Sequence, residues 1–483
     1  MDSLKQKSVD GVIWTLLEKF GSQFIKIILG VILARLLTPT DYGLIGMISV
    51  FFAISMVFID SGFGLAYVQK QDADDKDAST IFYFNLVVST LLYLVLWFTA
   101  PLIADFYGED QLLLLIRVMG CVLIINSFGL IQISKLKKNV DFKNKTLIML
   151  GSAILAICAG IIAALLNYGV WSLVIQEIVR ATLKSLGLWI FYKSKPLVYF
   201  SFKSLKTMLS FSLWSLFTSI LTSIFNNINI LVIGKYFPAA QLGFYTKAQT
   251  FQGMVSQQPS SAVGSVAFPV FAKIQHDKMA LKNAIRKFIR HAMFFVVPLA
   301  AILIVIAKPF ILLLLTEKWL PMAPYFQLLL LAGVLYPMQL INVQVLSAQG
   351  KMKLTFNLSM IKNTLRVLNV IIMYRFGVIF IIYGEIINSY LALVINTYYT
   401  KKFVDYGTLE QLKDVSTIIL TSGLLSLLGF MLLTKIPDPY LKIMTGVLFI
   451  GSFYLIGIYL FDKKLLKDNF IILRNKITGN KNL

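Results

Sequence analysis

Charged and polar side chains that fall inside apolar stretches are the residues of this sequence that could bind a ligand. The stretch 9–37 carries four of them at steps of four, three and four residues, which places them on one helical face: Thr15, Lys19, Ser22 and Lys26. Two hundred residues further on, the equivalent positions are also polar: Ser215, Ser219, Thr222 and Asn226. Two equivalent polar faces predict a shared wet cavity in which Lys19, Lys26 and Asn226 bind substrate. The alternative is a structural ion pair for Lys19 and a Lys26 that extends to the membrane interface.

A second group of charges lies in two later apolar stretches. Five of its members share helical faces by their spacing: Glu177, Arg180 and Lys184 on one helix, Lys362 and Arg366 on another. A charge at the bilayer centre costs about 2.5–3.5 kcal/mol on insertion scales, so each one needs a reason. Arginine and lysine in a cavity suit an anionic ligand, phosphate above all, because a guanidinium binds phosphate oxygens bidentately. For Arg180 and Lys184, structural ion pairs with Glu177 and Glu385 explain the spacing equally well.

Acidic residues suggest two further roles. Glu177 and Glu385 are candidate proton or sodium sites, and opposing effects of burial and of a neighbouring arginine leave their ionisation open. Asp60 begins the segment Asp60-Ser-Gly-Phe-Gly64, in which Gly62 and Gly64 allow helices to approach closely. We expect that segment to serve in helix packing or gating.

Motifs for catalysis are absent from the sequence. It contains no Walker A loop, no His-Glu-x-x-His and no dinucleotide fingerprint followed by an acid. Its two cysteines and two histidines are too few for a His/Cys metal site or a disulfide framework. We therefore expect no cofactor, no metal and no enzymatic activity.

The composition is that of a membrane protein. Of 483 residues, 58% are hydrophobic and 14% are charged, and the mean hydropathy is +0.78. About fourteen apolar segments are long enough to cross a bilayer, so the predicted fold is an all-α polytopic membrane protein. The net charge of +22 comes mostly from Lys and Arg in alternate connections, which places both termini in the cytoplasm by the positive-inside rule. Nucleic acid is not needed to explain this charge.

The chain also repeats itself. At offsets of 200, 216 and 208 residues, Trp14 matches Trp214, Asn126 matches Asn342 and Glu177 matches Glu385. We therefore predict two parallel six-helix lobes around a central cavity, over 1–200 and 201–405, followed by two extra transmembrane helices and a basic cytoplasmic tail over 406–483. Repeats of this kind bind substrate near the midplane between their halves, which indicates a transporter.

Several short motifs stand in an order known from one family: Ala34-Arg-Leu-Leu-Thr-Pro39, Asp41-Tyr-Gly43, Asp60-Ser-Gly-Phe-Gly64, Phe268-Pro-Val-Phe-Ala-Lys273 and Lys318-Trp319. The sequence resembles the Wzx-type polysaccharide and O-antigen flippases, especially the colanic-acid-exporter-like branch, of the multidrug/oligosaccharidyl-lipid/polysaccharide (MOP) superfamily. The motifs do not carry over individual cavity residues.

The resemblance implies a flippase that moves undecaprenyl-pyrophosphate-linked oligosaccharide from the cytoplasmic to the outer leaflet of the bacterial inner membrane, for surface polysaccharide or lipopolysaccharide synthesis. Its partners would be membrane lipid, the lipid-linked oligosaccharide, a polysaccharide polymerase and glycosyltransferases. A drug/cation antiporter and a lipid II flippase of the same superfamily remain alternatives. A membrane glycan polymerase is disfavoured, because the loops predicted to face outward are short.

Overall fold

The computed structural model describes residues 27–467 except 61, 62, 71 and 192–195, together with 14, 18, 21, 23, 25 and 469; at 65 and 207–215 it describes the backbone alone. These residues form helices and contain no strand. Ten helices are long and apolar enough to cross a membrane. The prediction of an all-α, polytopic membrane protein is confirmed, whereas the number of fourteen spans stays a prediction.

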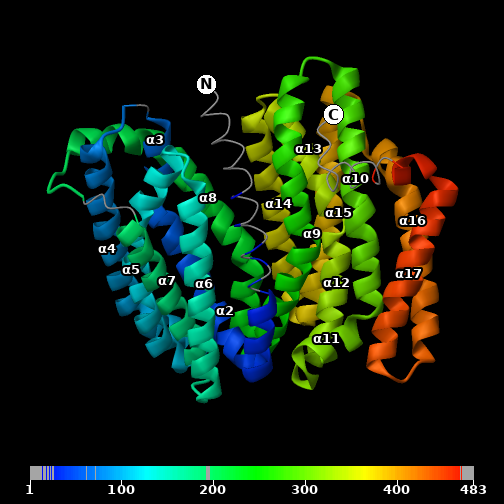
Figure 1. The fold of residues 1–483 in the computed structure, drawn as a ribbon, viewed down its shortest axis with the longest axis horizontal. Coiled ribbons are helices and arrows are strands. Elements are labelled where there is room, and N and C mark those ends of the chain that lie inside the picture. The colour runs from blue at the N-terminus through cyan, green and yellow to red at the C-terminus, as the bar shows by residue number, and fades with distance from the viewer. Residues whose placement is uncertain are drawn as a thin grey trace. The chain divides into compact units, whose positions relative to one another are not determined.

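The chain divides into two compact units, Met1–Gly243 and Phe244–Leu483. The named helices of the first unit are α2 (Pro39–Asp60), α3 (Phe63–Gln69), α4 (Asp75–Tyr107), α5 (Gln111–Lys138), α6 (Phe142–Leu165), α7 (Trp171–Phe191) and α8 (Phe202–Tyr236). Figure 1 follows them along the chain from blue to green. The predicted three-part division at residues 200 and 405 stays a prediction.

The first helix of the second unit is α9 (Ala239–Lys273), which begins just before the boundary between Gly243 and Phe244. The helices after it are α10 (Lys278–Val305), α11 (Ala307–Leu315), α12 (Ala323–Gly333), α13 (Tyr336–Ala348), α14 (Met352–Met373), α15 (Val378–Val404), α16 (Thr408–Thr434) and α17 (Pro439–Phe461), with short 3₁₀ turns at Glu317–Met322 and Tyr374–Phe376. The last two helices pack against each other, orange and red in Figure 1.

Local sequence explains where the helices of the first unit begin. Asp74 caps α4 through a capping box, in which its carboxylate accepts from the Asp77 N–H while the Asp77 side chain accepts from the Asp74 N–H. Gly108 ends the same helix in the left-handed conformation, at φ +70°. Asp141 caps α6 by accepting from the Asn144 N–H. The pairs α4–α5, α5–α7 and α6–α7 then pack closely, and α5, α6 and α7 line the candidate site together with α2.

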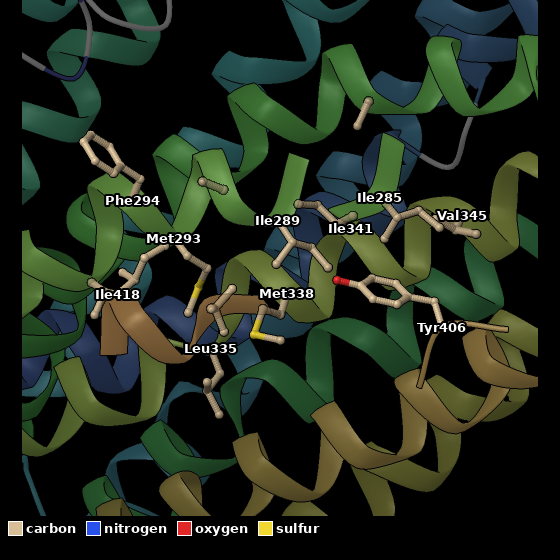
Figure 2. Packing of buried hydrophobic residues seen from close by; sticks show 14 of the residues in the cluster. Ile285, Ile289, Met293, Phe294, Leu335, Met338, Ile341, Val345, Tyr406 and Ile418 are labelled. Atoms are coloured by element: carbon tan, nitrogen blue, oxygen red, sulfur yellow. The ribbon is translucent and has the colours of Figure 1, made fainter. Parts of the chain in front are cut away.

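The core of the second unit forms around α10. Figure 2 shows Ile285, Ile289 and Met293 of α10 in one buried cluster with Met338 and Ile341 of α13. Arginines at the start of α10 bind acidic groups of the two C-terminal helices: Arg286 binds Glu410 and Asp414 at 2.7 and 2.6 Å, and Arg290 binds Asp462. The predicted extra helices are therefore joined to the second unit by ion pairs as well as by apolar packing.

One predicted span contains a short interruption of its helix. The apolar stretch 322–347 lies within Glu317–Ala348, which is long and apolar enough to cross a membrane, and it forms α12 and α13 with a turn at residues 334–335 between them. Pro337 lies in the first turn of α13, where a proline is tolerated. A Cβ at Gly333 would lie 1.9 Å from Nε2 of Gln252 and 2.8 Å from Oγ of Ser256, both on α9. Any larger residue at position 333 would force the side chains of Gln252 and Ser256 to move where α12 meets α9.

Candidate functional site

The first unit contains a cavity of about 580 Å³ whose walls come from four helices and from Glu18. α2 contributes Ile45, Ser49, Phe52, Ala53 and Met56, and α5 contributes Met119, Val122 and Asn126. The wall is completed by Met149, Ser152 and Ala153 of α6 and by Glu177, Arg180, Ala181 and Lys184 of α7. The apolar side chains come largely from α2 and α5, and the charged ones from α7. A concave site with this division suits a ligand that has an apolar and a polar part.

The sequence of α7 explains why its charges face the cavity. Its buried face includes Val174, Ala181 and Leu188, at steps of seven residues. Close contacts press α7 against its neighbours: a Cβ at Gly160 of α6 would lie 3.1 Å from Cβ of Gln176, and one at Gly129 of α5 would lie 2.9 Å from Leu188. The charged residues lie beside the buried face and line the cavity together with Ala181. The predicted common helical face of Glu177, Arg180 and Lys184 is therefore present.

The two cations of α7 have partners of different kinds. Arg180 donates to the Glu177 carboxylate one turn earlier on the same helix. Lys184 donates to the amide oxygen of Asn126, which is buried on α5. The structural ion pair that the sequence left open is therefore present for Arg180. Lys184 has a hydrogen bond to a neutral group, which satisfies one of its donors and leaves its charge uncompensated by that partner.

Glu18 was missed by the sequence analysis, which picked its neighbour Lys19. The Glu18 carboxylate binds Nζ of Lys145 at 2.8 and 2.9 Å, and both side chains are mostly buried. Lys145 lies near the start of α6, because Asp141 begins this helix before the apolar run. Glu18 and Lys145 are 127 residues apart, so no local spacing relates them.

The four charged side chains that line the described cavity balance, because Glu18 and Glu177 stand against Arg180 and Lys184. Arg180 is paired with Glu177, and Glu18 is paired with Lys145 from outside this lining, so Lys184 is bonded to a neutral amide. A desolvated cation beside uncharged walls attracts an anion more strongly than an exposed one does, because little water screens it. Arg180 adds a guanidinium that can bind two oxygens of one phosphate if its bond to Glu177 is exchanged. The arrangement is therefore suited to an anionic group such as phosphate.

The equivalent region of the second unit is arranged differently. Glu385 of α15 accepts a hydrogen bond of 2.5 Å from the hydroxyl of Tyr245 on α9, whose ring is fully buried. Tyr245 occupies the position that matches Ile45 in the first half, where the smaller side chain lines the cavity. Lys362 donates to Asn396 at 3.1 Å, and Asn369 donates to Asn388 at 2.6 Å. Here too the lysine is held by a neutral amide.

The remaining predicted site residues have the following positions. Lys19, Lys26 and Gly62 lie outside the described residues. Arg366 lies on α14, one turn beyond Lys362, and Asn226 is exposed on α8 and is not among the cavity walls given above. Asp60 is exposed at the end of α2. Gly64 lies on α3, where a Cβ would be 2.8 Å from Oγ of Ser134 on α5, and its role in packing or gating stays a prediction.

A comparison with family models decides the family. Residues 32–324 match the model of a family described as "Polysaccharide biosynthesis protein". The chain belongs to this family. The predicted resemblance is thereby confirmed, and the match covers every cavity wall named above except Glu18.

Curated relatives and a solved structure agree with this assignment of a polysaccharide biosynthesis protein. The chain is 27% identical over 358 residues to the teichuronic acid biosynthesis protein TuaB of Bacillus subtilis, with 74% of each chain covered. It is 26% identical to the succinoglycan biosynthesis transport protein ExoT of Rhizobium meliloti, over 67% of this chain and 66% of that one. Its fold is similar to that of the lipid II flippase MurJ in an inward closed conformation, with a TM-score of 0.78, 17% identity and coverage of 94% of this chain and all of that one.

Proposed function

We propose that this polysaccharide biosynthesis protein is a flippase that moves undecaprenyl-pyrophosphate-linked oligosaccharide from the cytoplasmic to the outer leaflet of the bacterial inner membrane, with both termini in the cytoplasm and without catalysis. The family and the name of the relative ExoT support transport in polysaccharide synthesis. The MurJ-like fold is compatible with a lipid-linked cargo. Membrane lipid, a polymerase and glycosyltransferases would be its partners.

The observation that carries this proposal is the pair of cations in the cavity of the first unit. Lys184 is held by the neutral Asn126, so its charge is available to a pyrophosphate, and Arg180 is one turn away on α7. A cavity of about 580 Å³ is of small-molecule size, so it would hold the pyrophosphate and the first sugars while the lipid tail stays in the bilayer. Lys19, Lys26, Asn226, Lys362 and Arg366 are proposed to contact the rest of the cargo.

The acidic residues are proposed to couple this movement to an ion. Glu177 binds Arg180, so a phosphate that takes over Arg180 would release the carboxylate for a proton or sodium ion. Glu385 would respond through its hydrogen bond with Tyr245. Asp60, Gly62 and Gly64 are proposed to act in gating, where α3 meets α5.

A lipid II flippase is the second candidate, since its cargo carries the same pyrophosphate and the fold is shared. A drug/cation antiporter fits less well, because both acidic walls of the cavity are paired with cations, whereas Lys184 is bonded to a neutral amide. Complementation of cells depleted of their lipid II flippase separates the first two candidates. Resistance to cationic drugs without any change in surface glycan would favour the third.

The test is surface polysaccharide export by variants of the two cavity cations. We expect Arg180→Gln and Lys184→Gln each to lower export at least about tenfold, because each removes a charge-assisted bond to phosphate. Lipid-linked oligosaccharide should accumulate at the cytoplasmic face. Lys413→Gln, an exposed lysine on α16, is the matched control and should export normally. Normal export by the double variant at wild-type protein level would refute the role of the cavity.

A further inference from the structure

The segment that joins α7 to α8 is held in place by its backbone. The Leu197 N–H donates to Oγ of Ser79 at 2.8 Å, and the Ser201 N–H donates to Oγ1 of Thr80 at 3.2 Å. Just after it, Leu205 is buried in a cluster that contains Ala78 and Ile81 of α4. The described part of this linker, residues 196–201, is therefore anchored along the start of α4.

The side chains of this anchored segment point away from the protein. Val198 is 99% exposed and Phe202 is 79% exposed, and Leu197, Tyr199 and Phe200 are exposed as well. Phe200 and Phe202 contact each other edge to face, with ring centroids 5.0 Å apart. Contiguous exposed apolar side chains on an ordered segment mark a surface that another apolar phase covers.

The place at which the linker binds α4 indicates that the apolar phase is the membrane. α4 has 33 residues and is thus about 50 Å long, whereas the hydrocarbon core is about 30 Å thick. Its first turn carries Asp75, Lys76 and Asp77, and its apolar run begins at Ile81. Ser79 and Thr80, to which the linker is bound, lie where the charged turn meets the apolar run. In a helix that spans the bilayer, we expect such a change from charged to apolar residues at the boundary between headgroups and acyl chains.

Basic residues accompany the apolar ones. Nζ of Lys76 lies 5.3 Å from the ring centroid of Tyr199, and Lys206 is exposed one turn after Phe202. Lys193 and Lys195 precede the segment in the sequence. Aromatic and aliphatic side chains flanked by lysines are typical of segments that lie in the membrane interface and bind anionic lipid.

We propose that residues 197–202 are an interfacial membrane anchor, which inserts Val198 and Phe202 among the headgroups of the leaflet facing the proposed cytoplasmic side, while Lys76 and Lys206 bind anionic phospholipid. The linker between the two repeats is then fixed at a set depth. This inference depends on the orientation of the chain in the membrane and not on the cargo.

Depth measurement by electron paramagnetic resonance tests the anchor. Nitroxide labels are placed at V198C, D72C and L91C in full-length protein that carries C121A and C158A, reconstituted in vesicles of phosphatidylethanolamine and phosphatidylglycerol. Leu91 is an exposed residue in mid-α4, and Asp72 is an exposed residue of the polar loop before α4. We expect the ratio of oxygen to Ni-EDDA accessibility at residue 198 to exceed that at residue 72 at least about threefold and to approach that at residue 91.

Two results would overturn the anchor. A ratio at residue 198 equal to that at residue 72 would place the segment in water, and protection from both reagents would show that protein covers it. If the cysteine-free protein is unstable, V198W in the otherwise unchanged chain gives the same information. Its added fluorescence should be quenched by lipids brominated near the headgroup, relative to the wild-type protein with its six tryptophans.

The lysines are tested by the lipid dependence of the same signal. In the labelled V198C protein with both lysines present, replacing phosphatidylglycerol by phosphatidylcholine should lower the accessibility ratio at residue 198 by about half, since the anionic surface no longer attracts the lysines. The variant K76Q/K206Q should show the low ratio in both kinds of vesicle, and K413Q should behave like the unchanged chain. An identical ratio in both kinds of vesicle would overturn the anionic-lipid part of the proposal.

Discussion

Lys184 of α7 donates a hydrogen bond to the amide oxygen of Asn126 on α5, and this bond joins two of the four helices that line the described cavity. The bond orients the ammonium group without neutralising it. In the second half of the chain, Lys362 and Asn396 repeat the same combination of lysine and amide. The charge of Lys184 is therefore the property of the site that mutation should probe first.

Replacing the amide by a carboxylate should inactivate the site while preserving its shape. In Asn126→Asp, the new carboxylate forms an ion pair with Lys184 and competes with a phosphate for it, so we expect export to fall at least about tenfold. Asn126→Gln keeps the amide and should retain most of the activity. Surface polysaccharide and protein level are measured together. Export by Asn126→Asp at the level of Asn126→Gln would contradict the role of an uncompensated Lys184.

The ion pair between Glu18 and Lys145 should contribute to stability, because both side chains are mostly buried. Removing one partner leaves a buried charge, so Lys145→Met alone should destabilise more than the double variant Glu18→Met, Lys145→Met. A double-mutant cycle on thermal unfolding in detergent should give a coupling free energy of about 1–3 kcal/mol. A coupling near zero would mean that the pair is solvated in the folded protein.

Glycines in the first unit should differ sharply in their tolerance of a methyl group. A Cβ at Gly120 of α5 would lie 2.6 and 2.8 Å from ring atoms of Tyr93 on α4, whereas nothing lies within 4 Å of one at Gly151 of α6. Gly120→Ala should therefore lower the free energy of unfolding by about 1–3 kcal/mol through overpacking. Gly151→Ala should be neutral or stabilise by up to about 1 kcal/mol through helix propensity. Equal effects of the two variants on thermal unfolding would contradict the described α4–α5 packing.

Tyr406, in the connection between α15 and α16, should make stability fall at alkaline pH. Burial, and then its hydrogen bond of 2.7 Å to Asp414, raise the pKa of this phenol above its ordinary value of 10.0, with Arg286 opposing the shift. The folded state therefore favours the neutral phenol of Tyr406. This preference contributes stability that is fully present below pH 10 and is lost as the pH rises from there through the pKa of the folded state.

The variant Tyr406→Phe separates this effect from other alkaline titrations. At pH 7 it should be less stable by about 1 kcal/mol, since Asp414 loses a hydrogen bond. Above pH 10 the difference from the wild-type protein should shrink. There Tyr406 ionises in the unfolded wild-type protein, which lowers the free energy of unfolding, whereas the phenylalanine variant has no proton to lose at this position. Thermal unfolding between pH 7 and pH 11 measures it. A difference that stays constant across this range would contradict the raised pKa.

Features that depend on local periodicity were predictable. The common face of Glu177, Arg180 and Lys184 follows from helical spacing, and it is present on α7. The apolar runs likewise predicted an all-helical membrane protein, and the predicted span 322–347 lies within one apolar segment long enough to cross a membrane. The turn between α12 and α13 inside this span, and the close approach of Gly333 to Gln252 of α9, were not predicted.

Features that depend on contacts between distant segments were not predictable. Glu18 was overlooked, because its partner Lys145 is 127 residues away. The sequence also made the two halves look alike, but at one equivalent position Ile45 lines a cavity, whereas Tyr245 binds Glu385. A single larger side chain at that position changes the environment of the neighbouring carboxylate.

The sequence by itself determined that this chain spans a membrane, that it is helical and which helical face carries its charges, because hydropathy and a period of 3.6 residues are local properties. Only the tertiary structure decided which charges compensate each other. Arg180 is paired with Glu177, Lys145 with Glu18, and Lys184 with a neutral amide. Such pairing depends on where α5, α6 and α7 bring their side chains together, and that depends on the close packing of residues such as Gly129 and Gly160.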